Sequence, residues 1–224
     1  MALILQLETA STNCSVSLSR DGVLVASKEH NSASYSHSEQ LHVFIREVLE
    51  EAGVTMAELQ AIAVSKGPGS YTGLRIGVST AKGLCYALDI PLISTRTLRG
   101  MALQKNIDSG LIIPMLDARR MEVYMAVFDS DYKEVSPTKA LVITVDAFQE
   151  YAEKGPVYLI GSGATKCKEI LEHPNLYFDD RVIPSSKTMC KAAYQKFESG
   201  DFEDVAYFEP YYLKDFILQT KTKS

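Results

Sequence analysis

The chain has 224 residues, of which 46% are hydrophobic and 23% charged, and its formal net charge is -5. This composition is typical of a folded globular protein and argues against intrinsic disorder. The sequence has no long run of lysine and arginine, which argues against a protein that binds nucleic acid tightly without a partner. No apolar run is long enough to cross a bilayer, so we expect no membrane span and a cytoplasmic protein.

The first half of the chain, residues 1–107, is expected to form one lobe. It opens with three antiparallel strands joined by tight turns, predicted over Leu3–Thr9, Cys14–Ser19 and Val23–Glu29. Apolar residues then recur at helical spacing over Ser38–Ala52. A buried strand, Leu59–Ser65, leads through a glycine-rich turn into a second helix, Tyr71–Leu88. A short strand over Ile90–Ile93 and a third helix over Thr95–Asn106 complete the lobe.

The second half, residues 108–224, repeats this order loosely. Its predicted elements are paired strands within Leu111–Phe128, a helix near Asp146–Glu153, a strand over Val157–Gly161, and helices near Ala164–Leu171 and Ser186–Glu198. Two lobes that each open with a hairpin and continue through β-α-β units predict an α/β fold of the two-lobed actin-like type, shared by sugar kinases and Hsp70 (ASKHA). Each lobe would be a mixed sheet flanked by helices, with the C-terminal segment able to pack back on the first. A single doubly wound sheet is the alternative.

Three turns are candidates for a nucleotide or phosphate site. In SKGPGSYTGLRIGVSTAKGL, Ser65–Leu84, a strand runs through glycines into a helix start, where free N–H groups can hold an anion. The turn after the first strand adds a carboxylate, and LIGSGATK, Leu159–Lys166, gives a further glycine turn. The residues concerned are Glu8, Thr9, Gly67, Gly69, Ser70, Gly161 and Gly163. The alternative is that these turns serve backbone geometry alone, since the chain has no GxxxxGK[ST] P-loop.

Histidines and cysteines give no metal-binding pattern. The four histidines form neither an HExxH motif nor an i, i+4 pair, and the four cysteines are widely scattered without a CxxC pair. We therefore predict no metal and no cofactor, and we interpret the cysteines as small buried residues. A GxSxG elbow is also absent from the sequence, which leaves a serine hydrolase without support.

Three segments together resemble the TsaB (YeaZ) family: LETAST with CSVSL, then GPGSYTGLRIGVSTAKGL, then DARRMEVYMAVF, Asp117–Phe128. The near-terminal EPYYLKD, Glu209–Asp215, extends the similarity across essentially the whole chain. The resemblance implies an actin-like fold and a paralogue relation to the TsaD enzymes, which transfer a threonylcarbamoyl group to an adenosine of tRNA. It also implies a non-catalytic subunit that pairs with TsaD, helps recruit the ATPase TsaE, and meets tRNA only within the complex.

One departure from the TsaD pattern bears on catalysis. TsaD carries an HxxxH metal motif shortly after the helix that follows the glycine turn, and these two positions fall on Thr97 and Met101 here. Neither side chain replaces imidazole as a metal ligand, so neither metal nor catalysis is expected. The rival hypothesis is an ATP-dependent small-molecule kinase of the same fold, with Glu8, the two glycine turns and Asp117 as its working parts. A metalloprotease lacks a ligand set.

The helix predicted over Tyr71–Leu88 has two largely uncharged faces when its residues are placed at 100° intervals. Such a helix is usually buried on both sides. Gly77 and Gly83 each cost about 1 kcal/mol relative to alanine within a helix, which suggests that another backbone comes close. We expect the second face to bind TsaD, with the Ser38–Ala52 helix alongside, or to pair two copies in a symmetric dimer. The alternative is that the second lobe covers it. The predicted interface residues are Thr72, Arg75, Ile76, Ser79, Thr80, Gly83 and Ala87.

Overall fold

The structure, a computed structural model, describes residues 1–32 and 37–214. The first half of the chain forms β1 (Leu3–Glu8), β2 (Asn13–Arg20), β3 (Val23–Asn31), α1 (His37–Ala52), the 3-10 turn η1 (Met56–Glu58), β4 (Ala61–Ser65), α2 (Tyr71–Leu88), β5 (Leu92–Thr95) and α3 (Thr97–Ala102). The second half forms β6 (Leu111–Asp117), β7 (Glu122–Asp129), β8 (Glu134–Val142), α4 (Gln149–Ala152), β9 (Val157–Ile160), α5 (Ser162–Lys168), β10 (Leu176–Asp179), η2 (Ser186–Met189) and α6 (Cys190–Ser199).

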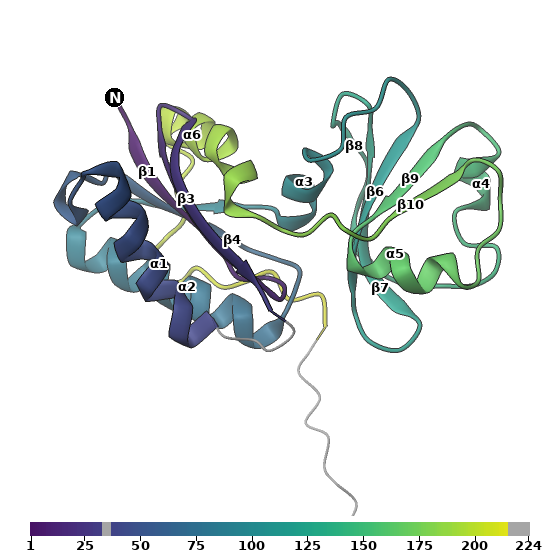
Figure 1. Ribbon diagram of the computed structural model, residues 1–224, viewed down its shortest axis with the longest axis horizontal. Helices are drawn as coiled ribbons and strands as arrows, with labels where there is room; N and C mark the ends of the chain where they lie inside the picture. The colour runs from purple at the N-terminus through teal and green to yellow at the C-terminus, as the bar shows by residue number, and fades with distance from the viewer. Residues whose placement is uncertain (33–36, 215–224) are drawn as a thin grey trace, which may run out of the picture.

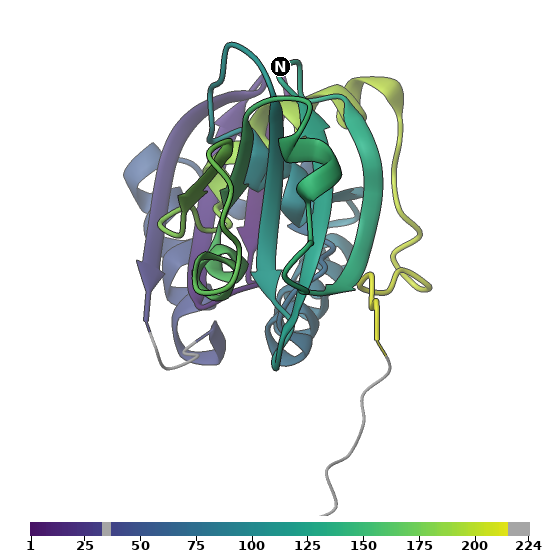
Figure 2. The ribbon, with the colours of Figure 1, turned by 90° about the vertical axis from the view of Figure 1, so that its right-hand side faces the viewer.

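These elements build two lobes, each with a five-stranded mixed sheet (Figure 1). The first sheet has the order β3-β2-β1-β4-β5 and the second the order β8-β7-β6-β9-β10. In both, the first three strands are antiparallel and the last two join in parallel. The repeated topology confirms the predicted actin-like class and rules out a single doubly wound sheet. Figure 2, viewed from the side of the second lobe, shows one sheet in front of the other.

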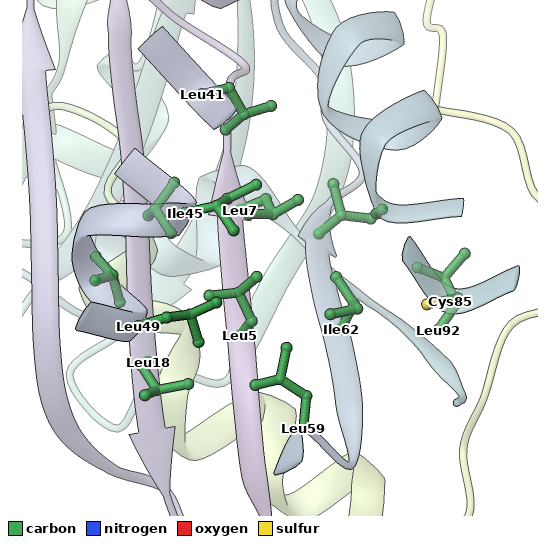
Figure 3. Packing of buried hydrophobic residues seen from close by; sticks show 14 of the residues in the cluster. Leu5, Leu7, Leu18, Leu41, Ile45, Leu49, Leu59, Ile62, Cys85 and Leu92 are labelled. Atoms are coloured by element: carbon green, nitrogen blue, oxygen red, sulfur yellow. The ribbon is translucent and has the colours of Figure 1, made fainter. Parts of the chain in front are cut away.

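The first sheet is covered on both faces, and the side chains of its central strand β1 point alternately into the two hydrophobic clusters. Leu5 and Leu7 of β1 pack in the cluster that includes Leu41 and Ile45 of α1 (Figure 3). Ile4, one residue out of step, belongs to a cluster with Met189 and Ala193 of η2 and α6. Successive side chains of a strand point to opposite faces, so α1 and α2 cover one face and α6 the other.

The last described segment of the chain lies on the first lobe. After α6, the backbone of Glu203 pairs with Leu92 at the free edge of β5. The ammonium of Lys82 on α2 then donates to the carbonyl oxygens of Ala206 and Phe208, at 3.0 and 3.1 Å. The segment thus runs from the sheet edge to the flank of α2. Among the described residues, no helix is long and apolar enough to cross a membrane.

Candidate functional site

The turn after β1 and the start of α2 meet at a glycine junction. A Cβ on Gly69 would lie 2.3 Å from the carbonyl oxygen of Ala10, and one on Gly73 would lie 2.1 Å from that of Thr9. The Ser70 amide donates to Ala10 at 2.7 Å, and the Ser70 hydroxyl caps α2 by accepting from the Gly73 amide at 3.2 Å. Glycine is needed here because two backbones touch, and this contact accounts for the junction without a bound anion.

The turn at Gly67 is filled by the chain's own groups. Its amide donates to the hydroxyl of Thr97 at 3.1 Å. The preceding carbonyl, of Lys66, accepts from the amide of Tyr211 at 2.7 Å. The carbonyl oxygen of Tyr211 lies 3.2 Å from the point that a Gly67 Cβ would occupy. The start of α3 and the C-terminal segment therefore occupy two sides of this turn, which leaves less of its backbone for a phosphate.

Glu8 is buried in a hydrogen-bond network rather than presented to a ligand. Its carboxyl accepts from the hydroxyl of Ser65 at 2.6 Å and from the amide of Ala10 at 2.7 Å. The hydroxyl of Thr97 donates in turn to that of Ser65 at 3.4 Å. Burial raises the pKa of Glu8 to about 7, and the hydrogen bonds from Ser65 and Ala10 oppose that shift. The carboxyl is thus divided between its neutral and charged forms near neutral pH, which suits packing better than Mg²⁺ binding.

The glycine turn before α5 is a second packing junction, in the other lobe. A Cβ on Gly161 would lie 2.3 Å from the terminal methyl of Met101 and 2.4 Å from the carbonyl oxygen of Met115. One on Gly163 would lie 2.7 Å from the Cβ of Met115. The structure therefore gathers Glu8, Thr9, Gly69 and Ser70 at one junction, whereas Gly161 and Gly163 contact methionines of α3 and β6.

The two positions that correspond to the TsaD histidines are both used inside the protein. Thr97 is 2% exposed, and its hydroxyl ties the Gly67 turn to α3. Met101 is fully buried in a cluster of α3 with residues of the second sheet, among them Ile112 and Phe128. Within residues 1–32 and 37–214, the structure contains no group of three or more His, Cys, Asp or Glu residues that could hold a metal ion. The four cysteines are buried and free.

The second face of α2 is open. Thr72, Ser79 and Ala87 are exposed, and a Cβ on Gly83 would meet no atom within 4 Å. The two helix glycines thus differ, because a Cβ on Gly77 would lie 2.2 Å from the hydroxyl oxygen of Thr9 in the same chain. Of the two, Gly83 is the one for which no group among the described residues requires a glycine. The alternative that the second lobe covers this face does not hold for the described residues.

One flank of α2 is covered, by the C-terminal segment. The Arg75 guanidinium lies 4.2 Å from the centre of the Tyr71 ring and donates to the hydroxyl of Tyr212 at 3.3 Å. Of the predicted interface residues, Arg75 is therefore partly engaged within the chain, while Ile76 and Thr80 are half-buried. The packing role of Gly73 went unrecognised in the sequence, although its four-residue spacing from Gly77 places these two glycines on one side of α2.

Comparison with known proteins gives consistent results. The sequence model of the family described as "TsaD: tRNA N6-adenosine threonylcarbamoyltransferase" matches residues 26–213. The "tRNA threonylcarbamoyladenosine biosynthesis protein TsaB" of Bacillus subtilis is 31% identical over 175 residues, which cover 75% of each chain. Its namesake from Escherichia coli K12 is 29% identical over 229 residues, 97% of each chain. Among solved structures, "YeaZ from Pseudomonas aeruginosa" has a TM-score of 0.79 at 25% identity and covers 95% of this chain and 100% of its own.

Proposed function

This chain belongs to the TsaB (YeaZ) family, and we propose that it is the non-catalytic partner of a TsaD enzyme in the transfer of threonylcarbamoyl to an adenosine of tRNA. Its place in tRNA threonylcarbamoyladenosine biosynthesis follows from the family. The observation that supports the non-catalytic role is that Thr97 and Met101 both make contacts inside the protein. One holds a turn amide and the other fills a core, so neither can orient a substrate through a metal.

The contact with TsaD is proposed to use the second face of α2, with α1 beside it. Both helices lie on the same face of the first sheet (Figure 1). Apart from Arg75 at its edge, the exposed residues of this α2 face, Thr72, Ser79, Gly83 and Ala87, are small and uncharged, which is unusual for a solvated helix and typical of one that packs against a partner. Gly83 would let a partner backbone approach closely. In the absence of TsaD, the same face would pair two copies of the chain in a symmetric dimer.

The remaining partners are proposed to act through the complex. A net charge of -5 without a basic run offers few phosphate contacts, so tRNA would be held mainly by TsaD. The resemblance to the TsaB family is the reason for assigning recruitment of the ATPase TsaE to the complex of this chain with TsaD. The kinase hypothesis gains no support: the carboxylate of Asp117 accepts from the ammonium of Lys166 at 2.6 Å, and the glycine turns are filled by packing.

Reconstitution of the reaction tests this function. Unmodified tRNA, labelled threonine and the other enzymes of the reaction would be supplied to this chain alone, to TsaD of the same organism alone, and to both. We expect label in tRNA only when both proteins are present. Met101→Leu, which conserves core volume, should support the same rate because Met101 is not a metal ligand. Transfer by this chain alone, or a TsaD rate that this chain does not change, would refute the proposal.

A further inference from the structure

A pocket of about 430 Å³ lies between α3, α6 and the ends of β4 and β5. Its volume falls within the range of about 300 to 1,000 Å³ found for small-molecule sites. Arg96 and Arg99 line it from the α3 side, Lys196 from α6, and Lys66 from the end of β4. Asp201 is the one acidic residue among the described lining residues. In a chain with more acidic than basic residues, this is a local excess of positive charge.

Three of these four cations are held by the protein itself. Arg96 pairs with Glu134, Arg99 donates to a backbone carbonyl at 2.9 Å, and Lys196 pairs with Asp201 at 2.9 Å. The ammonium of Lys66 differs, because no hydrogen bond or ion pair engages it anywhere in residues 1–32 and 37–214. Lys66 as a residue is half-buried. Among the described residues, the pocket thus combines three engaged cations with one, Lys66, that no other group engages.

Thr95 adds to the same pocket a hydroxyl that has no hydrogen-bond partner among the described residues. The amide of Lys66 donates to the carbonyl oxygen of Thr95 at 2.8 Å, and both residues line the pocket. Strand alternation puts Thr95 on the same face of β5 as Ile93, which packs with Met189 and Ala193 on the α6 side. Thr95 is 8% exposed, and its hydroxyl has no hydrogen-bond partner among the described residues. Buried hydroxyls are normally paired, so this one marks a position where a ligand oxygen would be stabilised.

The pocket is separate from the features that carry the proposed function. Arg96, Arg99 and Gly100 line the pocket, whereas Thr97 and Met101 are not among its described lining residues. None of the described lining residues belongs to α1 or α2. A ligand here would therefore bind whether or not the second face of α2 meets TsaD.

We propose that this pocket binds the phosphate group of a small phosphorylated ligand, with the Lys66 ammonium and the Thr95 hydroxyl as its direct contacts. Arg99, which donates to a backbone carbonyl, adds further positive potential, while Glu134 and Asp201 offset the charges of Arg96 and Lys196. The excess of cations favours a phosphate dianion over a single carboxylate. A small ligand is favoured over an RNA backbone because RNA needs a row of phosphate contacts, and a net charge of -5 without a basic run does not provide one.

Calorimetric titration tests the site with three probes: inorganic phosphate, AMP and unmodified tRNA. Lys66→Gln should weaken the binding of phosphate or AMP by about tenfold or more, the loss expected for one charge-assisted contact. Thr95→Val should also weaken it without lowering the melting temperature, because the hydroxyl has no partner among the described residues to lose. Lys191→Gln, at an exposed position of α6 outside the pocket, is the matched control and should leave binding unchanged.

Each other result overturns the proposal. If neither phosphate nor AMP binds the parent protein, or if both bind Lys66→Gln as tightly as the parent, the pocket is not the site. If tRNA binding alone weakens in Lys66→Gln, the cations contact RNA and the small-ligand assignment is wrong. Circular dichroism of each variant establishes that it is folded before its titration is interpreted.

Discussion

Replacement of Gly73 by alanine tests the close contact between α2 and the turn after β1. The new Cβ would lie 2.1 Å from the carbonyl oxygen of Thr9, more than about 1 Å inside the usual carbon to oxygen contact distance. That oxygen belongs to the backbone and cannot rotate away, so α2 must move. Overpacking of this kind costs about 1 to 3 kcal/mol, and the helix preference of alanine returns at most about 1 kcal/mol. We expect a net loss of about 2 kcal/mol in the free energy of unfolding.

Gly83→Ala is the matched control on the same helix. No atom lies within 4 Å of its Cβ position, so alanine should stabilise the protein by about 0.5 to 1 kcal/mol. Thermal and urea unfolding followed by circular dichroism measure both variants. For a chain of this size, the Gly73→Ala loss corresponds to a fall of about 4 to 8 °C in melting temperature. A Gly73→Ala protein as stable as Gly83→Ala would refute the argument that glycine is required by the contact.

Three further predictions concern the buried carboxyl, the metal and RNA. Burial raises the pKa of Glu8 from 4.5 to about 7, so the unfolded chain loses this proton first and the stability of the parent relative to Glu8→Gln falls as the pH rises between these values. Urea unfolding across that range measures the difference, and one that does not vary with pH would contradict the assignment. Elemental analysis should find no stoichiometric iron or zinc in the purified chain, and one tightly held ion per chain would overturn the non-catalytic role. Filter binding at physiological salt should show only weak tRNA binding by the chain alone. Tight binding would contradict the inference that a chain with a net charge of -5 makes few phosphate contacts.

Much of the fold could be predicted because strong local patterns mark it. The bounds of α2 and β6 agree with the sequence, since a serine cap and a continuous apolar run define them. β8 and β10 were not predicted, because both are edge strands that are only partly buried, and β8 contains Pro137. The third helix is shorter than expected because Thr95 extends β5 by pairing with Ser65. The lobe boundary at residue 107 remains a prediction.

The candidate site was less predictable because its contacts join distant parts of the chain. The glycine turn was recognised, but nothing local shows that Tyr211 would lie against Gly67 and Lys66. Lys66 and Thr95 line one pocket because the parallel pairing of β4 and β5 brings their backbones together. The capacity of the Gly67 and Gly161 turns to hold a nucleotide also remains a prediction.

The binding of TsaD to a charged variant of α2 tests the central proposal most directly. Thr80→Arg and Gly83→Glu together place one charge of each sign on the open face. The control is Lys191→Glu with Glu198→Arg, which exchanges two existing charges at exposed positions of α6. After circular dichroism establishes folding, light scattering with and without TsaD measures association. The two new charges are three residues apart and can pair with each other. Burying even a paired charge costs several kcal/mol of desolvation, so the α2 variant should bind TsaD at least about 30-fold more weakly while the control binds normally. A folded α2 variant with unchanged affinity for TsaD would show that the contact lies elsewhere.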